Sequence, residues 1–153
     1  MRQSCVYESG KIAVMPKTFE ALLEQDGLTT SKATVRTHTV FVDRPADRGG
    51  ADRGPVGGEY QLVALGGCFT SHLLAAIRAR EAPISNVRVA VTGTLDGTPE
   101  RFTEFTLSVS ATCDDAESLR KVVTIAERAC QVVNTLKLAA PVTVTVQETM
   151  AMK

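Results

Sequence analysis

The longest apolar pattern in the chain is a helical one that runs from Glu59 to about Glu81. Large apolar residues recur at helical spacing along it, at Leu62, Leu65, Phe69, Leu73, Ala76 and Ile77. Nearly every face is apolar or small until Arg78, so the pattern predicts a helix that is buried on all sides. In a chain this short, such burial indicates that a partner subunit supplies part of the cover. Pro83 is predicted to end the helix.

Two adjacent glycines, Gly66 and Gly67, lie in the middle of this helix. Each costs about 1 kcal/mol of helix stability relative to alanine. Close approach of another backbone is the usual reason for such a cost, so these positions are expected to lie in a close-packed contact.

Two alternating segments follow, residues 84–95 and 102–112, with Asp96-Gly97-Thr98-Pro99 between them as a turn signal. Alternation of this kind on both sides of a turn predicts an antiparallel hairpin. Next, Asp114 or Asp115 is expected to cap a helix that continues through Ala129.

The C-terminal part is predicted to hold one more short element and a last strand. Residues 131–138 are expected to be a helical or irregular continuation. Pro141 then opens a strand of alternating valine and threonine at residues 142–146.

The N-terminal part has weaker patterns. Pro16 and residues 17–25 predict a short amphipathic helix, with Gly27 after its end. Residues 31–42 alternate and are rich in β-branched side chains, which predicts one strand with a face in water. Residues 43–58 are rich in Gly and Pro, so they are expected to form a loop. Its length favours a functional segment, and a mobile surface excursion is the alternative.

The order of these elements predicts the α+β fold class, because a hairpin and helices follow one another without parallel βαβ units. The 153 residues are long enough to bury a hydrophobic core without disulfides. We therefore expect one domain over residues 1–153, in which residues 1–30 form an N-terminal extension with a short helix.

Charge and hydropathy narrow the choice of partners. The chain has 17 basic and 17 acidic residues and no basic block, which argues against nucleic acid as a partner. No apolar run approaches the roughly 18 to 20 residues of a membrane-spanning helix, and the N-terminus lacks a signal-peptide core. The expected location is therefore the cytoplasm, without a membrane partner.

The four cysteines, at positions 5, 68, 113 and 130, do not form a C-x-x-C pair. In a reducing cytoplasm this spacing favours neither a disulfide scaffold nor a zinc site. Cys68 follows Leu65-Gly66-Gly67 on the long helix, and Cys130 follows Ala126-Glu127-Arg128-Ala129 at the end of another. If the two helices pack together, these thiols could cycle between dithiol and disulfide. The alternative is that both are buried core cysteines.

These features, together with the loop Gly49-Gly50 to Gly54-Pro55 and with Glu59, resemble the OsmC/Ohr family of thiol-dependent hydroperoxide-resistance proteins. The likeness extends from about Asp43 to Val146. It implies an intertwined homodimer in which antiparallel sheets wrap around two central helices. That arrangement agrees with the helix whose apolar pattern extends all round.

The resemblance also implies a reaction. Cys68 would be the peroxidatic thiol that attacks a hydroperoxide, organic ones included, and becomes a sulfenic acid. Cys130 would be the resolving thiol, which forms a disulfide that a cellular thiol or dithiol then reduces. The chain would thus be a cysteine-based hydroperoxide reductase of the stress response, and neither a cofactor nor a metal is expected.

Members of the family stabilise the peroxidatic thiolate with a glutamate and an arginine. Their pattern places Asn-Pro-Glu just before the helix, where this chain has Gly57-Gly58-Glu59, so Glu59 is the nearest equivalent and a candidate catalytic residue. The candidates for the arginine are Arg36, Arg44 and Arg48.

The two histidines and the other two cysteines carry weaker signals. His72 lies one helical turn after Cys68 and shares its face, so it is either a base or metal ligand beside the thiols or a hydrogen-bonded residue at the dimer seam. His38 is expected to be solvated, and Cys5 and Cys113 to be structural.

A second function from another class stays open. The chain could be a non-catalytic dimeric protein of the same fold that binds a small apolar ligand in the cleft between its subunits. The two thiols together with a nearby cation would favour the enzyme.

Overall fold

A computed structural model describes residues 16–147 of the chain. These residues form two compact units, one that ends at Gly54 and one that begins at Pro55. That residues 1–153 form one domain stays a prediction. Cys5 and the first half of the predicted N-terminal extension lie outside the described residues.

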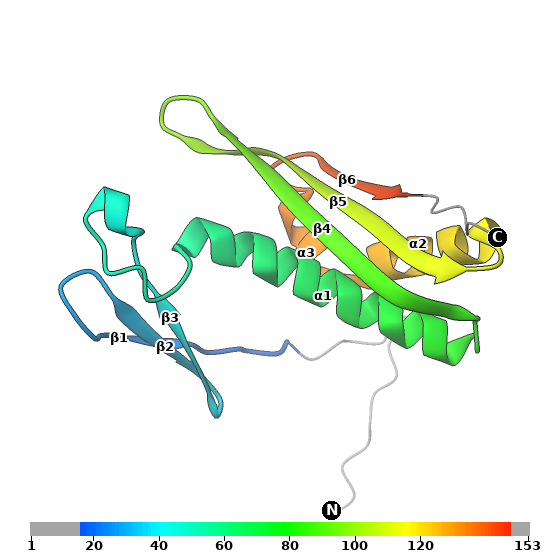
Figure 1. Ribbon diagram of the computed structural model, residues 1–153, viewed down its shortest axis with the longest axis horizontal. Helices are drawn as coiled ribbons and strands as arrows, with labels where there is room; N and C mark the ends of the chain where they lie inside the picture. Colours follow the sequence, from blue (N-terminus) through cyan, green and yellow to red (C-terminus); the bar gives the residue numbers. More distant parts are fainter. Residues whose placement is uncertain (1–15, 148–153) are drawn as a thin grey trace, which may run out of the picture. The chain divides into compact units, whose positions relative to one another are not determined.

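The N-terminal unit contains a three-stranded antiparallel sheet, drawn in blue and cyan in Figure 1. Its strands are β1 (Leu22–Gln25), β2 (Ser31–Val35) and β3 (His38–Val42), in the order β1-β2-β3. A single 3-10 turn, η1 (Ala46–Arg48), lies in the following loop. The prediction of a long loop over residues 43–58 is therefore largely right, although the next helix already begins at Gly57.

The predicted helix over residues 17–25 is wrong. Residues 16–21 have no regular structure, and Leu22–Gln25 form strand β1, which pairs with β2. The apolar residues that suggested a helix, Phe19, Leu22 and Leu23, are 88%, 60% and 57% exposed. An amphipathic helix needs a surface on which to bury its apolar face. Pairing with β2 satisfies the backbone of β1 instead.

The single strand predicted over residues 31–42 is two strands. Arg36 and Thr37 form a two-residue turn, and β2 folds back on β3 with Val35 opposite His38. Arg36 has a φ of 55°, the left-handed conformation that tight hairpin turns require. Residues other than glycine, asparagine and aspartate adopt it infrequently, so Arg36-Thr37 is not a recognisable turn signal.

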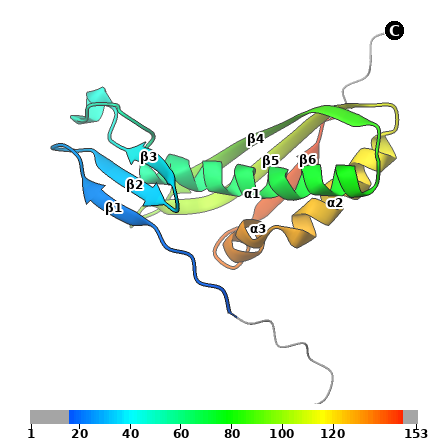
Figure 2. The ribbon, with the colours of Figure 1, turned by 90° about the horizontal axis from the view of Figure 1, so that it is seen from below.

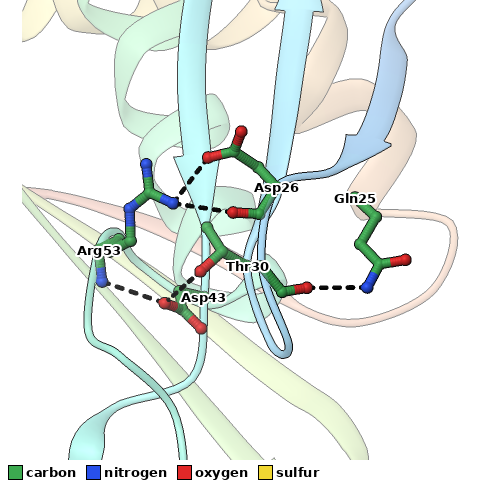
Figure 3. A network of polar contacts seen from close by, with 6 residues as sticks. Gln25, Asp26, Thr30, Asp43 and Arg53 are labelled. Carbon is green, nitrogen blue, oxygen red and sulfur yellow. Dashed lines mark hydrogen bonds and ion pairs between the residues drawn. The ribbon is translucent and has the colours of Figure 1, made fainter.

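Asp43 closes this unit by joining the end of β3 to the loop that follows (Figure 3). Its buried carboxylate accepts hydrogen bonds from the Thr30 hydroxyl at 2.8 Å and from the Arg53 backbone N–H at 3.3 Å. The Arg53 guanidinium in turn contacts the Asp26 carboxylate at 2.6 Å and lies 4.4 Å from the centre of the Phe41 ring. One carboxylate thus ties the β1–β2 turn, β3 and the loop together.

The pKa of Asp43 reflects these contacts. Burial alone would raise it, but hydrogen bonds from Thr29, Thr30 and the backbone of Arg44 and Arg53 outweigh burial and lower the pKa to about 2. Since the pKa of the folded state lies below the ordinary value of 3.8, ionised Asp43 stabilises the fold. That stabilisation is complete above the ordinary pKa and is lost as the pH falls through about 2.

We therefore expect Asp43→Asn to lower the free energy of unfolding at neutral pH, because the amide cannot accept every bond that the carboxylate accepts. The difference from the unsubstituted protein should shrink as the pH falls from about 4 toward 2. Urea unfolding followed by circular dichroism at several pH values measures it. The exposed Asp47→Asn is the control and should behave like the original chain. A loss of the same size at pH 7 and near pH 2 would contradict this role of the charge.

The C-terminal unit holds three helices and a second three-stranded sheet. Its elements are α1 (Gly57–Ala79), β4 (Ile84–Asp96), β5 (Arg101–Cys113), α2 (Ala116–Ala129), α3 (Gln131–Leu136) and β6 (Val142–Val146). The α+β class and every element predicted after residue 58 are confirmed, with ends that differ by two residues or fewer. The carboxylate of Asp115 caps α2 by accepting hydrogen bonds from the backbone of Glu117 and Ser118.

The helices lie on one face of this sheet, as Figure 2 shows. In β5 the residues that face them are buried: Phe105, Leu107, Val109 and Ala111. Their alternation with half-exposed neighbours is the pattern of a strand covered on one side. Because α1 contacts α2, α3 and β4, the core lies between the helices and the sheet.

One pairing departs from the expected antiparallel sheets. Strands β4 and β5 pair antiparallel, but β6 pairs parallel with β5, with Leu107 opposite Val144. A parallel pair needs a long crossover connection, which α2 and α3 provide between the two strands.

Within this chain α1 is not buried on all sides as the pattern predicted. The large residues of one face, Leu65, Phe69 and Leu73, are fully buried, whereas Val63 and Leu74 on other faces are 59% and 50% exposed. Apolar spacing shows which positions avoid water, but it does not show whether the cover comes from the same chain.

Helix α1 is also long and apolar enough to cross a membrane by length and composition, contrary to the expectation that no run approaches that length. The glycines, alanines and serines between its large residues leave its mean hydropathy high because they carry no charge. The buried core helix of a water-soluble protein meets the same criterion, and α1 packs one face against α2 and β4. The absence of a membrane partner stays a prediction.

Candidate functional site

The two thiols predicted to react lie on adjoining elements of the C-terminal unit. Cys68 is in the middle of α1 and half-buried. Cys130 is the single residue between α2 and α3, where it ends one helix and caps the next, and it is fully buried. Both are free cysteines. The packing of α1 against α2 and α3 thus brings together positions that are far apart in the sequence.

The two thiols are neighbours, and their environments differ. The Cys68 thiol donates to the side-chain oxygen of Gln131 at 3.4 Å, and the Cys130 sulfur accepts a hydrogen bond from the Val133 N–H at 3.5 Å. Burial raises the pKa of the Cys130 thiol, the Val133 N–H opposes this, and the neighbouring Cys68 raises the pKa further. Cys130 is therefore held as a neutral thiol, whereas Cys68 is the more accessible of the two.

Gln131 completes the cluster, and the sequence had not indicated it. Its side-chain oxygen lies 3.4 Å from Cys68 Sγ and 3.1 Å from His72 Nε2. Gln131 is the first residue of α3, and its own carbonyl accepts a hydrogen bond from Thr135 at 2.9 Å. Its place directly after Cys130 is the only sequence signal that could have indicated it.

His72 therefore contacts the amide of Gln131, which also contacts the thiol. The shared face of Cys68 and His72 follows from their spacing of one helical turn on α1. Among residues 16–147, no group of three or more His, Cys, Asp or Glu side chains is arranged to hold a metal ion. His72 has an uncharged amide as its hydrogen-bond partner.

Glu59 lies apart from the thiols within the chain. Its carboxylate accepts a hydrogen bond from the Val56 backbone N–H at 2.9 Å, so it caps the N-terminus of α1. Glu59 and Cys68 are nine residues apart, which places them on opposite faces of α1 and about 13 Å apart along its axis. A catalytic role for Glu59 stays a prediction.

The other candidates lie elsewhere. Arg36, Arg44 and Arg48 belong to the N-terminal unit, so the C-terminal unit by itself does not place them at Cys68. His38 is exposed at the start of β3, and Cys113 is half-buried at the end of β5.

An apolar groove of about 710 Å³ runs along the exposed face of α1 beside β4. It is lined by Leu62, Val63, Gly66, Gly67, Thr70, Ser71, Leu74, Val89 and Val91. None of these side chains carries a charge. The groove therefore offers an apolar surface with small residues along its floor.

The glycine pair of α1 divides between the sheet and this groove. A Cβ on Gly66 would lie 2.8 Å from a methyl group of Val91 on β4, so a glycine is needed there. The group that approaches closely is a side chain and not the backbone expected from the sequence. A Cβ on Gly67 would meet nothing within 4 Å. Gly67 is thus a helix-weakening residue for which the chain itself offers no packing reason.

Solved structures share this fold at low sequence identity. An OsmC-like protein from Mycoplasma pneumoniae has a TM-score of 0.76 at 17% identity, over 87% of this chain and 98% of that one. An organic hydroperoxide resistance protein OsmC from Legionella pneumophila has a TM-score of 0.68 at 17% identity, over 88% and 100%. The organic hydroperoxide resistance protein OhrB of Bacillus subtilis has a TM-score of 0.63 at 17% identity, over 86% and 98%.

The comparison with curated protein sequences finds no match. The model of the family described as OsmC-like protein, in contrast, matches residues 49–145, which is more than half of the chain. The matched region includes both thiols, Gln131 and the whole of α1. The resemblance seen in the sequence is confirmed: the chain belongs to the family of OsmC-like proteins.

Proposed function

We propose that this protein is a thiol-dependent peroxidase that reduces hydroperoxides, organic ones included, in the cytoplasm. The observation that carries the proposal is that half-buried Cys68 and fully buried Cys130 are neighbours, with Cys68 packed against the core that contains Cys130. A peroxidatic thiol must be reachable by its substrate, and a resolving thiol must be close enough to form a disulfide. The solved structures named for organic hydroperoxide resistance agree with this chemistry.

The first step is a two-electron oxidation of Cys68. Its thiolate attacks the distal oxygen of the hydroperoxide, the O–O bond breaks, and the alkoxide leaves as an alcohol after taking a proton. Cys68 becomes a sulfenic acid. The raised pKa of Cys130 keeps that thiol protonated, so it does not compete for the peroxide.

The second step returns the site to its reduced state. The Cys130 sulfur attacks the sulfenic sulfur, water leaves, and a Cys68–Cys130 disulfide forms. A cellular dithiol or two small thiols then reduce the disulfide and are themselves oxidised by two electrons. No metal or organic cofactor takes part in this sequence.

We further propose that the protein acts as a homodimer, with a second copy in the apolar groove beside α1. Val63 and Leu74 expose large apolar side chains there, and the uncovered Gly67 lets another helix approach closely. The apolar pattern around α1 is then explained, since a second α1 would cover the face that this chain leaves open. A small apolar ligand in the same groove is the competing use, as in a non-catalytic binding protein.

The resolving role of Cys130 is tested by Cys130→Ser. The variant should still reduce one equivalent of cumene hydroperoxide in a rapid first turnover, because Cys68 is intact. In excess peroxide, steady-state turnover with a dithiol reductant should fall at least about tenfold as the sulfenic acid is oxidised irreversibly. Mass spectrometry of the peptide with Cys68 should then show the addition of two oxygens.

The original chain should instead show a peptide pair joined by a 68–130 disulfide. The control is Cys113→Ser, which removes a half-buried thiol outside the cluster and should leave both results unchanged. Sustained turnover by Cys130→Ser without irreversible oxidation would contradict the resolving role.

A further inference from the structure

The Cys68 thiol has one neighbour whose purpose the peroxidase scheme leaves open, the side-chain amide of Gln131. That amide contacts Cys68 and His72 at the same time, through one oxygen, at 3.4 Å and 3.1 Å. Amide oxygens have two lone pairs, so both contacts can be hydrogen bonds when the thiol and the imidazole Nε2 carry protons. This arrangement suits the resting thiol.

The same arrangement does not suit a thiolate. Once the Cys68 proton has gone to solvent, the sulfur is an acceptor, and an amide oxygen 3.4 Å away would oppose its charge. The amide of glutamine has oxygen and NH₂ ends of nearly equal shape, and its terminal torsion is roughly two-fold. A half-turn about that torsion presents the two N–H donors where the oxygen was.

We infer that Gln131 is a positioning residue that stabilises the Cys68 thiolate by reversing its amide, with His72 holding the amide in both orientations. In the reversed state one N–H donates to the sulfur and the other to the lone pair of His72 Nε2. A neutral histidine allows both states because its single proton can lie on either ring nitrogen. The proposal deepens the proposed function, on which it rests.

The surroundings favour this role. Gln131 is attached directly to buried Cys130, and its carbonyl is held by Thr135, so its backbone is fixed while its exposed side chain has room to turn. Two titratable groups, Cys130 and His72, lie beside Cys68 and Gln131 in the described structure. A hydrogen-bond donor in the place of the amide oxygen would favour a thiolate over a thiol.

The test is the pH dependence of Cys68 alkylation by iodoacetamide, measured on the full-length reduced protein by mass spectrometry of the peptide that contains Cys68. Gln131→Met keeps the length of the side chain and removes the donors, so the midpoint should rise by about one pH unit, the amount that a hydrogen bond to a charged group supplies. Gln131→Glu should raise it further, because a second negative charge faces the sulfur.

His72→Leu should raise the midpoint less than Gln131→Met, because the amide remains but is no longer held. In the double variant, the change at His72 should add nothing to Gln131→Met, since His72 acts through the amide. The matched control is Asn134→Met, which removes an exposed amide of the same helix that donates to the Arg128 carbonyl and not to the thiol cluster. It should leave the midpoint unchanged.

An unchanged midpoint in Gln131→Met, an equal shift in Asn134→Met, or additive shifts in the double variant would overturn the inference. Alkylation needs no peroxide and no reductant. A negative result here therefore leaves the peroxidase tests valid, and a protein without peroxidase activity can still show the shift.

Discussion

Cys68→Ser is expected to abolish hydroperoxide reduction. A serine hydroxyl is not ionised near neutral pH and does not form the sulfenic acid on which the proposed cycle depends. The rate of cumene hydroperoxide consumption with a dithiol reductant should fall roughly a thousandfold or more, to the level of the reductant alone. Ferrous iron oxidation by residual peroxide measures the loss.

This experiment also separates the two candidate functions. Cys113→Ser is the control, because it removes another half-buried thiol of the same unit and should keep full activity. If the original chain and Cys68→Ser consume peroxide equally slowly, the protein is not a peroxidase, and the apolar groove beside α1 becomes the better indication of its function.

Leu74→Glu is expected to convert a dimer into monomers. Leu74 is 50% exposed in the single chain and lines the groove, so a second copy there would bury it. A carboxylate at that position would be desolvated in each subunit, and a central contact of this kind costs about 2 kcal/mol or more of binding free energy. The dissociation constant should therefore rise at least about 30-fold, which sedimentation velocity over a range of concentrations detects.

The matched control is Leu95→Glu. Leu95 is 52% exposed on β4 and lies outside the groove lining, so the same change of residue at the same exposure should leave the dimer intact. A monomeric original chain, or equal dissociation by both variants, would contradict the assignment of the groove to a second copy.

The C-terminal unit could be predicted from the sequence because its signals are long and mutually consistent. The hairpin has a glycine-containing turn between two long alternating strands, and α2 is capped by Asp115, one of the two predicted candidates. Residues 17–25 gave a window too short to distinguish helix from strand. Only the pairing with β2, which is not local, makes β1 a strand. The Arg36-Thr37 turn carries no glycine or asparagine to announce it.

The catalytic roles of the site residues stay predictions. The resemblance indicated the two cysteines, and the structure places them as neighbours. The role of Gln131 could not be seen, because its contact with Cys68 joins residues 63 positions apart and depends on how α3 packs against α1. The apolar pattern of α1 likewise predicted a helix buried on all sides, but it could not show that part of this apolar surface is exposed in the single chain.

The position of Cys130 between two helices has a consequence for the folding energy of the oxidised protein. A disulfide to Cys68 would close a loop that contains the β4–β5 hairpin and all of α2. Closing a loop of about 60 residues removes conformational entropy from the unfolded chain worth roughly 4 kcal/mol. The proposed disulfide would then be a temporary brace, present after each peroxide is reduced and absent again once the reductant has acted. The disulfide form of the protein would therefore have a higher free energy of unfolding than the dithiol form.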